Sequence, residues 1–546
     1  MQLPQLPAYY YLQNFHSVLD WVSARYADLL SVDESAFIVD FKRLGNCAQA
    51  LLVRLIMRKG RHFRLARLSY PEIGDLEHAA VALLRAGWLC DDCPIDAAEL
   101  CALLRREELV EHFPQYVSHR SIAKSELTVH LTSIESQSKS FRQWCPKLND
   151  RLLTLTVTEL ADRLRLMFFG NMRQDWSEFV LADLGVFRYE QVAFSTASRG
   201  FHARRDIDDF LHLHRCRESF ERGQPVPDVL ALIEGFCSDN RQIRARHAKL
   251  LFYMGQHLER AGDFEAALPL YERSIHPGAR QRRIRILEKL GQVEQAWQLA
   301  QAAMANPESD AERQLVQRAI NRLSPKRGGR RIARTRPAEH GLLELCLPRP
   351  DTGTVEHAVR EHLSQPDTPV FYVENTLLNS LFGLLCWEAI FAPLPGAFFH
   401  PFQGAPADLL DIDFHARRRA LFDDAFAQLD SESYRARIRT TFINKYGLQS
   451  PFVCWGALDE SLLDIALACI PPWQLKACFQ RLLGDIKANR AGMPDLIQFW
   501  PAERRYRMIE VKGPGDRLQD NQRRWLAFCA EQRMPVDVCY VRWIDA

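Results

Sequence analysis

Two carboxylates and a lysine surround a pair of short apolar segments near the end of the sequence. A short polar stretch separates Leu496–Trp500 from Tyr506–Ile509, a pattern that predicts a β-hairpin. Asp495 precedes the first segment and Glu510 follows the second, so antiparallel pairing would place both carboxylates at one end of the hairpin. Glu510 and Lys512 are two residues apart and would share one face of the strand. The motif therefore requires a sheet with polar side chains gathered at a strand end.

This set of side chains predicts a site for a divalent cation. Mg²⁺ and Mn²⁺ prefer oxygen ligands, which Asp495, Glu510 and the carbonyl oxygen of Val511 would supply. A metal ion would activate a water molecule and stabilise negative charge on phosphate oxygens. Lys512 would orient or deprotonate that water and offset charge in the transition state. The sequence therefore predicts metal-dependent hydrolysis of a phosphodiester.

Further candidates for the site lie on both sides of the hairpin. A site for two ions needs another carboxylate, and Glu374 is a candidate because it precedes Leu377–Leu385, an apolar run that predicts a buried helix. Glu388, farther along the same predicted helix, is the alternative. Downstream, Gln522 falls on the apolar face of a predicted helix, where it would bond either to the metal site or to the backbone of the core. We expect Asp516 to cap that helix.

The N-terminal half predicts small helical units. The first ninety residues have helical apolar spacing on both sides of a basic stretch, which is compatible with a winged-helix-like unit. A helix over 97–105, an extended segment and a helix from about 121 to 133 follow, and this is the layout of a SAP module, a small DNA-binding hairpin of helices. Both units are therefore candidates for contacts with DNA.

The middle of the chain predicts paired helices. Gly262 and Gly291 open similar runs 29 residues apart. Tetratricopeptide repeats are about 34 residues long, so the pattern predicts such repeats with one helix shortened or a tight turn. Ala267 and Ala296 are small enough for neighbouring helices to approach each other closely. Ser324–Pro337, rich in basic residues, Gly and Pro, predicts a linker to the last domain.

With 546 residues, the chain exceeds the size of one domain. The predicted fold class is a multidomain chain, mostly α-helical in its N-terminal and repeat regions, with a C-terminal α/β domain of the restriction-endonuclease-like fold. In that domain the alternating segment Val536–Val541 predicts a third strand. The predicted domains are an N-terminal, winged-helix-like DNA-contacting domain (1–95), a SAP-containing domain (96–215), a tetratricopeptide-like domain with a basic linker (216–335) and a nuclease domain (336–546).

The formal net charge of only +2 means that binding of nucleic acid would rely on local basic clusters. Residues 54–67 contain six basic side chains and no acid, and a second cluster occupies 280–285. One such cluster is usually a solvated face, but several together with a hydrolytic metal site favour phosphate contacts. The candidate DNA-binding residues are Arg54, Arg58, Lys59, Arg61, Lys124, Arg280 and Arg282.

The sequence gives no indication of a membrane partner. It contains no run of eighteen uncharged apolar residues, and its N-terminus lacks the layout of a secretion signal. Its fourteen cysteines are scattered, as in cytosolic proteins with reduced thiols. Cys90 and Cys93 form one CxxC pair, which indicates zinc only weakly without a second pair. We therefore expect a cytoplasmic protein.

The C-terminal part of the sequence contains a recognisable pattern. It consists of residues 491–496, residues 510–518, Gln522 and Trp525. It resembles the VRR-NUC catalytic domain of the Fanconi-associated nuclease family. Glu374 and the apolar run after it are similar to the upstream acidic helix of that family, which favours Glu374 over Glu388. The N-terminal segments and the repeats are similar to the family's DNA-contacting unit, SAP module and tetratricopeptide domain.

The resemblance implies a structure-specific endonuclease and 5′–3′ exonuclease that cuts 5′ flaps and branched DNA in interstrand cross-link repair. It also implies dependence on Mg²⁺ or Mn²⁺, with two ions. The cysteine–histidine cluster of the ubiquitin-binding finger in eukaryotic members is missing from this sequence. That departure suggests a bacterial-type member, expected to be monomeric and to associate with the nucleoid when acting.

A second departure concerns the pocket in which eukaryotic members bind the 5′ phosphate of the flap. Arg280 or Arg282 would supply the arginine of that pocket, but Ala311-Glu312-Arg313 stands where its histidine is expected.

Two other functions stay open at this point. One is a Holliday-junction resolvase-like nuclease, because isolated VRR-NUC domains can dimerise and cut four-way junctions. The other is a repeat scaffold with an inactive nuclease domain.

Overall fold

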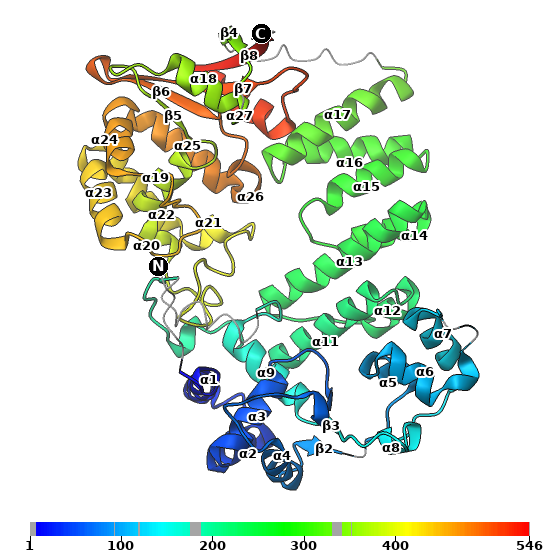
Figure 1. Cartoon of the computed structure of the whole chain (residues 1–546). Coiled ribbons are helices and arrows are strands. Elements are labelled where there is room, and N and C mark those ends of the chain that lie inside the picture. The colour runs from blue at the N-terminus through cyan, green and yellow to red at the C-terminus, as the bar shows by residue number, and fades with distance from the viewer. Residues whose placement is uncertain are drawn as a thin grey trace. The chain divides into compact units, whose positions relative to one another are not determined.

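The computed structural model describes residues 7–91, 93–117, 119, 121–174, 187–329, 341–350 and 352–544 (Figure 1). Contacts divide the chain into two compact units, each described separately below. The first unit comprises Met1–Phe187 with Phe201–Ile207, and the second comprises Arg188–Gly200 with Asp208–Ala546. The predicted four domains are a finer division and stay a prediction.

Helices form the N-terminal part of the first unit. They are α1 (Tyr10–Tyr26), α2 (Val32–Arg43), α3 (Asn46–Ile56) and α4 (Leu76–Arg85). Their apolar faces bury Phe15, Phe41 and Leu51 almost completely. Helix α2 begins with a capping box in which the side chains of Ser31 and Glu34 each accept the other residue's backbone N–H.

The same part of the unit contains a small sheet that the sequence did not reveal. Its strands are β1 (His62–Arg64), β2 (Leu89–Cys90) and β3 (Leu152–Leu155). They pair antiparallel in the order β1-β3-β2. The central strand therefore comes from sequence beyond the predicted boundary at residue 95. The strand β1 and the 3₁₀ turn η1 (Leu65–Arg67) lie within the basic stretch.

The segment predicted as a SAP module forms short helices around its own core. They are α5 (Ala97–Leu103), α6 (Arg106–His112), the 3₁₀ turn η2 (Pro114–Tyr116), α7 (Lys124–Ile134) and α8 (Phe141–Trp144). Leu100, Leu109, Leu127 and Phe141 belong to one buried cluster. The prediction of an extended segment after α5 was wrong, because α6 lies there. Helix α9 (Thr158–Phe169) then follows β3.

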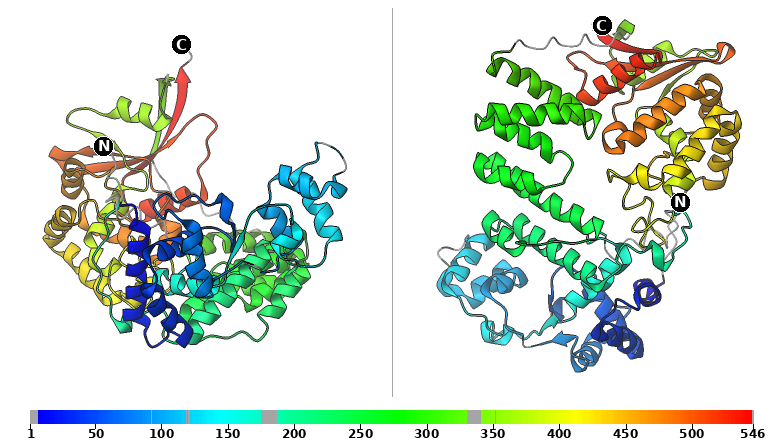
Figure 2. Two further views of the ribbon diagram at one scale, coloured as in Figure 1. Left: turned by 60° about the horizontal axis from the view of Figure 1, so that its bottom comes forward. Right: turned by 180° about the vertical axis from the view of Figure 1, so that it is seen from behind.

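Helices follow one another through the repeat region in successive layers, seen from two sides in Figures 1 and 2. They are α11 (Arg204–Glu221), α12 (Val226–Leu232), α13 (Arg241–Ala261), α14 (Phe264–Arg273), α15 (Ala279–Lys289), α16 (Val293–Ala305) and α17 (Asp310–Lys326). A Cβ atom on Gly255 would lie 3.0 Å from the ring of Tyr271, so α13 and α14 approach closely at a glycine. Ala267 and Ala296 are fully buried, as expected for helix contacts.

The predicted linker begins later than expected. Helix α17 continues through Pro325 to Lys326, because Lys326 and Arg327 are held by the acids Glu288 and Glu294 of the two preceding helices. Residues 330–340, which include the remaining basic residues of the predicted linker, lie outside the described residues.

A mixed five-stranded sheet forms the framework of the C-terminal domain. Its strands are β4 (Gly341–Pro348), β5 (Val370–Tyr372), β6 (Leu496–Trp500), β7 (Arg505–Lys512) and β8 (Val536–Ile544). Their order is β4-β8-β7-β6-β5, with β6 antiparallel to β5 and β7, and β8 parallel to β4 and β7. The predicted hairpin and third strand are thus confirmed, whereas β4 and β5 were not predicted.

Helices pack against this sheet and around a large apolar core that includes Phe382, Phe479 and Trp525. They are α18 (Val355–Leu363), α19 (Leu377–Leu385), α20 (Trp387–Ile390), α21 (Phe414–Arg417), α22 (Arg419–Ala427), α23 (Ser433–Lys445), α24 (Glu460–Cys469), α25 (Pro472–Gly484), α26 (Ile486–Asn489) and α27 (Asp520–Glu531). All nine residues of α19 are buried, as its apolar sequence predicted.

One face of the last repeat helix contacts the C-terminal domain through polar side chains. Asp310, Gln314 and Arg318 are four residues apart along α17, so they share one side of the helix. Arg481 donates to Asp310 at 3.0 Å and Arg524 to Gln314 at 2.8 Å. Arg318 donates two hydrogen bonds to Asp520, at 2.7 and 2.6 Å. Because Asp520 is the first residue of α27, this polar stripe on α17 holds the start of that helix.

No single helix among the described residues is long and apolar enough to cross a membrane. Only α24 and α25 taken together, bent by 108°, reach such a length and composition. Cys90 and Cys93 form a disulfide in the structure, which differs from the reduced thiols expected from the sequence.

A buried ion pair fastens the segment between α20 and α22. Asp408 and Arg418 are both inaccessible to solvent, and Arg418 donates to the two oxygens of Asp408 at 2.8 and 2.9 Å. Arg417 adds another hydrogen bond to the same carboxylate, and the Arg418 guanidinium lies 4.1 Å from the ring centroid of Phe414. Removing one partner would leave a buried charge without compensation.

We predict that Asp408→Ala lowers the free energy of unfolding by about 3–5 kcal/mol, because two arginines lose their buried carboxylate. Asp464→Ala is the matched control, since Asp464 pairs with Arg439 at 2.8 Å on the surface and should cost only about 0–1 kcal/mol. Urea titrations followed by tryptophan fluorescence measure both values. Equal effects of the two substitutions would contradict the importance of the buried pair.

Candidate active site

Three chain segments bring acidic residues to one edge of the five-stranded sheet. Leu496 pairs with Ile509 across β6 and β7, which sets Asp495 beside Glu510. On the other side of β6, Tyr372 pairs with Leu496, and the N–H of Val373 donates to the carbonyl oxygen of Asp495 at 2.8 Å. The end of β5, just before Glu374, therefore lies at the start of β6 and the end of β7.

The loop that leads to Asp495 is fixed by polar residues of neighbouring segments. Asn375 accepts the N–H of Met493 at 3.1 Å, and Asn379 donates to the carbonyl oxygen of Arg490 at 2.9 Å. Gly492 has a φ of 90°, and a Cβ atom there would lie 2.7 Å from the Asn521 side chain, so only glycine allows the start of α27 to pack on this loop. Sequence reasoning missed these supports, although Asn379 was a visible polar residue in an apolar run.

Asp495, Glu510 and Lys512 are all buried, with 5%, 1% and 7% of their surface exposed. Asp495 Oδ2 accepts the backbone N–H of Val511 at 2.7 Å, which orients the carboxylate. Burial raises the pKa of Asp495 to about 6, against the opposing effect of this hydrogen bond. Burial and the charge of Asp495 raise the pKa of Glu510 to about 7. Ionisation of both buried carboxylates is therefore unfavourable, and a bound cation would offset their negative charge.

The residues present fit a divalent cation. The ammonium of Lys512 lies 2.7 Å from Glu510 Oε1, but neither oxygen of Glu510 accepts a hydrogen bond with good geometry from the residues that the structure describes. A buried carboxylate with free lone pairs is costly unless it binds a cation. Glu510 and Asp495 thus offer the hard oxygen donors that Mg²⁺ and Mn²⁺ prefer. The role of the Val511 carbonyl oxygen stays a prediction.

Glu374 lies near the other two acids but is not assembled with them into a closed site. The hydroxyl of Tyr372 donates to Glu374 Oε2 at 2.5 Å, and Asn375 donates to Oε1 at 3.2 Å. The charge of Glu374 raises the pKa of both Asp495 and Glu510, so the three carboxylates influence one another. Within the described part of the chain, however, no group of three or more His, Cys, Asp or Glu side chains is close enough to hold a metal ion.

The expected position of Glu388 was wrong. Glu388 does not continue the helix that follows Glu374, because α19 ends at Leu385 and Glu388 lies in the separate helix α20. Its side chain is 75% exposed and pairs with Arg437 at 2.7 Å. Glu374 therefore lies closer to the sheet edge than this alternative.

The predicted surroundings of Gln522 and Asp516 were also wrong. Helix α27 begins at Asp520, and Gln522 accepts the N–H of Gln519 at 2.8 Å as part of a capping box. Gln522 is only half-buried, so it is neither a core residue nor bonded to the strand end. Asp516 does not cap the helix, because its carboxylate accepts the N–H of Gly513 at 3.0 Å within the preceding turn. A catalytic role for Gln522 stays a prediction.

Two residues near the site were not predicted from the sequence. Tyr372 holds Glu374 in place, and its position two residues before Glu374 was the available signal. Glu356, in the first turn of α18, lies near enough for its charge to raise the pKa of Asp495. No local pattern marked Glu356, since α18 reaches the sheet edge only through the fold.

Two of the five predicted DNA-binding residues of the first unit, Arg54 and Arg61, have acidic partners from distant segments. Arg54 pairs with Glu72 at 2.5 Å and lies 3.8 Å from the ring centroid of Tyr11. Arg61 pairs with Glu99 at 2.9 Å. The basic stretch contains no acid of its own, but the fold supplies them, so these two side chains are not free cations.

Arg58, Lys59 and Lys124 differ from these residues. None of the three has an acidic partner among the described residues, and Arg58 and Lys59 are exposed. Arg58 donates to the hydroxyl of Tyr70 at 3.0 Å, which is a neutral partner. Lys124 is half-buried in the first turn of α7. These side chains keep their positive charge available for phosphates.

The two arginines considered for a 5′-phosphate pocket are occupied by carboxylates. Arg280 pairs with Glu312 at 2.5 Å, and Glu312 is only 5% exposed. Arg282 pairs with Glu259 at 3.2 Å. Glu312 belongs to the segment in which the pocket's histidine was expected, so an acid takes the place of a group that would bind phosphate.

The fold and the site define a metal-dependent nuclease of the restriction-endonuclease-like class, since two acids and a lysine gather at the edge of a mixed sheet. Models of known families match the chain as a VRR-NUC domain over residues 429–543, as a FAN1 HTH domain over 9–90 and as a Fanconi anemia-associated nuclease SAP domain over 94–144. The chain belongs to the Fanconi-associated nuclease family, as its similarity to whole members demonstrates.

A Fanconi-associated nuclease 1 homologue from Pseudomonas aeruginosa is 52% identical over 542 residues, which cover 99% of this chain and 97% of that protein. A homologue from Arabidopsis thaliana is 25% identical and is matched over 99% of this chain and 68% of its own length. The crystal structure of paFAN1 bound to 5′ flap DNA of two nucleotides with a gap is similar with a TM-score of 0.92, 52% identity and full coverage of both chains.

We predict that the metal-free protein loses stability between pH 5 and pH 8 because of its buried carboxylates. The folded state raises the pKa of Glu510 to about 7, so protonated Glu510 favours folding at pH 5 and this contribution is lost as the pH rises through 7. In Glu510→Gln the free energy of unfolding should therefore fall by about 2 kcal/mol less between pH 5 and pH 8 than in wild type. Urea titrations in EDTA at both pH values measure it, with the exposed Glu388→Gln as control. If the pH dependence of stability were the same in Glu510→Gln as in wild type, this would contradict the raised pKa of Glu510.

Proposed function

We propose that this chain is a structure-specific DNA nuclease that cuts 5′ flaps and branched DNA by metal-dependent hydrolysis of a phosphodiester. The observation that carries the proposal is the buried set of Asp495, Glu510 and Lys512 at the sheet edge. Similarity to a protein whose structure was determined with 5′ flap DNA supports the choice of substrate. Cross-link repair is the cellular role that family membership implies.

Two divalent cations, Mg²⁺ or Mn²⁺, would act as Lewis acids in this reaction. Their ligands would be Glu374, Asp495, Glu510 and the carbonyl oxygen of Val511. The protein's own groups determine how the substrate meets them. The N–H of Val511 fixes the orientation of Asp495. The hydroxyl of Tyr372 holds Glu374 at the end of β5. Glu374 would be the third carboxylate of this set, and its hydrogen bond with Tyr372 fixes the side chain near Asp495 and Glu510.

Lys512 has two tasks in the proposed mechanism. Its ammonium lies 2.7 Å from Glu510 Oε1 and so partly balances the buried negative charge before the substrate binds. In the reaction it would orient the attacking water and stabilise charge on the phosphate oxygens. Its side chain is almost completely buried, so it is held in place and its charge is little screened by solvent.

We infer that the chain acts on DNA as a monomer within the cytoplasm. The acid–acid–lysine set is complete, which argues against a scaffold with an inactive nuclease domain. The carboxylates on Arg280 and Arg282 argue against capture of a 5′ phosphate by these arginines. Recognition of the branch itself, and not of a terminal phosphate by these arginines, is then the source of specificity.

Asp495→Ala is predicted to reduce flap cleavage with Mg²⁺ or Mn²⁺ at least about a thousandfold, because a metal ligand at the reacting phosphate is lost. Binding of the same DNA should persist within a few-fold of wild type. A single-turnover assay on a labelled 5′ flap measures cleavage, and a binding titration without metal measures affinity. Asp464→Ala, at an exposed acid of the same domain, serves as control. Full cleavage by Asp495→Ala would refute the site.

Arg58→Ala combined with Lys59→Ala is predicted to weaken DNA binding at low salt. The slope of log K against log salt concentration should become shallower by about 2, since each lost phosphate contact removes about 0.9. Arg54→Ala is the control, because Arg54 is paired with Glu72 and should lower stability without changing the slope. Binding titrations between low and physiological salt provide both values. A slope that changes in Arg54→Ala and not in the double variant would reverse the assignment.

A further inference from the structure

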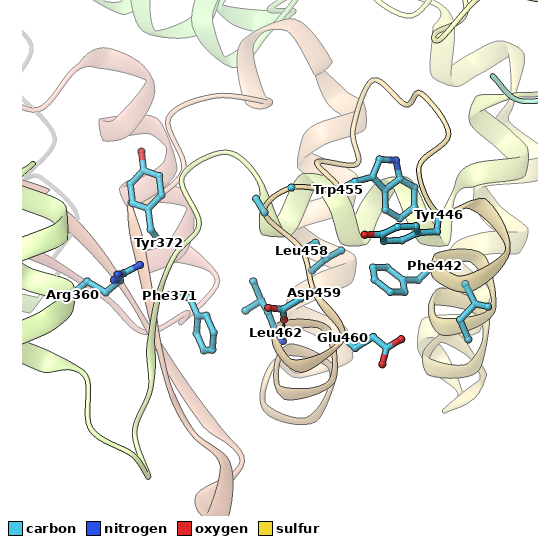
Figure 3. Close-up of a pocket in the computed structure, with 13 residues that line it drawn as sticks. Arg360, Phe371, Tyr372, Phe442, Tyr446, Trp455, Leu458, Asp459, Glu460 and Leu462 are labelled. Atoms are coloured by element: carbon cyan, nitrogen blue, oxygen red, sulfur yellow. Dashed lines mark hydrogen bonds between the residues drawn. The ribbon is translucent and has the colours of Figure 1, made fainter. Parts of the chain in front are cut away.

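A cavity of about 580 Å³ opens in the second unit beside the edge strand β5. Five aromatic side chains line it, as Figure 3 shows: Phe371 and Tyr372 lie on one side, and Phe442, Tyr446 and Trp455 on the other. The first pair belongs to β5, while the other three come from α23 and the segment that follows it. Its volume falls within the range of about 300–1,000 Å³ that small-ligand sites occupy.

The rings of Phe442, Tyr446 and Trp455 pack against one another to form one wall of the cavity. The ring of Tyr446 lies 5.3 Å from that of Trp455 at an angle of 60°, and Phe442 lies 5.8 Å from Trp455. The indole N–H of Trp455 donates to the carbonyl oxygen of Leu448 at 2.6 Å, so this ring is fixed. Tyr446 is nevertheless 56% exposed. A rigid, exposed aromatic face is a platform on which another flat ring can stack.

Charged groups at the cavity indicate which part of a ligand enters. Arg360 lies on the side of Phe371 and Tyr372 (Figure 3) and has no acidic partner among the described residues. Asp459 and Glu460 lie near Leu462 at the other side. These acids repel phosphates and can accept hydrogen bonds from the amino groups of a base. A nucleotide would therefore place its base inside the cavity and its phosphate towards Arg360.

The cavity is one side chain away from the carboxylate site. The ring of Tyr372 lines the cavity, while its hydroxyl donates to Glu374 at 2.5 Å. Helix α18 also touches both places. Its Glu356 affects the pKa of Asp495, and Arg360, one turn later on the same face, lines the cavity. Tyr372 and helix α18 thus connect the cavity wall to the carboxylate site.

We propose that this aromatic cavity holds one unpaired nucleobase of the DNA strand whose phosphodiester is cut at Asp495 and Glu510. The inference rests on the proposed nuclease function and specifies how the substrate is read. A base within a duplex is covered on both faces by its neighbours, whereas a base in a flap is free to stack on Tyr446 and Trp455. The cavity would therefore favour a single-stranded extension next to the cut site, independently of base sequence.

The test combines a ring deletion with a base deletion. Tyr446→Ala removes the exposed ring, Tyr446→Phe keeps it, and Trp473→Ala removes an exposed aromatic elsewhere in the same domain. Each variant is assayed on a thymidine 5′ flap and on flaps with one abasic nucleotide at each position in turn. We expect Tyr446→Ala to lower kcat/KM about tenfold on the intact flap, with no loss on the flap whose abasic position corresponds to the cavity. Tyr446→Phe and Trp473→Ala should match wild type.

Equal losses on the intact flap and on every abasic flap would overturn the proposal, since they would show a structural role for Tyr446. No loss on any flap would overturn it too, and would leave the cavity to a protein ligand. Binding of oligothymidylate and of its abasic counterpart in EDTA separates this inference from the nuclease proposal. If wild type cleaves no flap but Tyr446→Ala loses the preference for the base-containing strand, the nuclease function fails and the cavity stands.

Discussion

The pairing register of β6 and β7 brings together two carboxylates that repel each other, and the whole site depends on it. Leu496 lies opposite Ile509, and a slip by one residue would turn Glu510 and Lys512 to the other face of the sheet. Burial of Ile497, Phe499 and Met508 in the large core fixes this register. The raised pKa values of both acids record the electrostatic cost. Apolar packing of the domain supplies the stability that holds the two charges together.

Local patterns could be predicted from the sequence, whereas pairings between distant segments could not. The hairpin, the buried helix α19 and the paired repeat helices follow from apolar spacing within a few dozen residues. The strand β4 pairs with β8 almost two hundred residues later, so its partner could not be predicted from nearby sequence, and β5 is only three residues long. The sheet of the first unit likewise takes its central strand from residues 152–155.

The same distinction between local patterns and distant pairings explains which parts of the candidate site could be predicted. Asp495, Glu510 and Lys512 lie in one hairpin, so sequence spacing alone could bring them together. Gln522 was misplaced because α27 begins at Asp520, which turns its side chain into a cap instead of a core residue. The basic stretch was overestimated as a DNA surface because Glu72 and Glu99 reach it from other elements. Charge along a sequence does not reveal which opposite charge the fold will place beside it.

The polar stripe on α17 is a contact that ionic strength should weaken, in addition to any contacts with DNA phosphates. The ion pair between Arg318 and Asp520 is about half exposed on both sides, and such pairs weaken as the screening length falls to about 8 Å in physiological salt. The next residue, Asn521, packs on the loop that carries Asp495. Helix α17 therefore supports the candidate site through an ion pair that salt weakens, so a rise in salt acts on this contact as well as on the binding of phosphates.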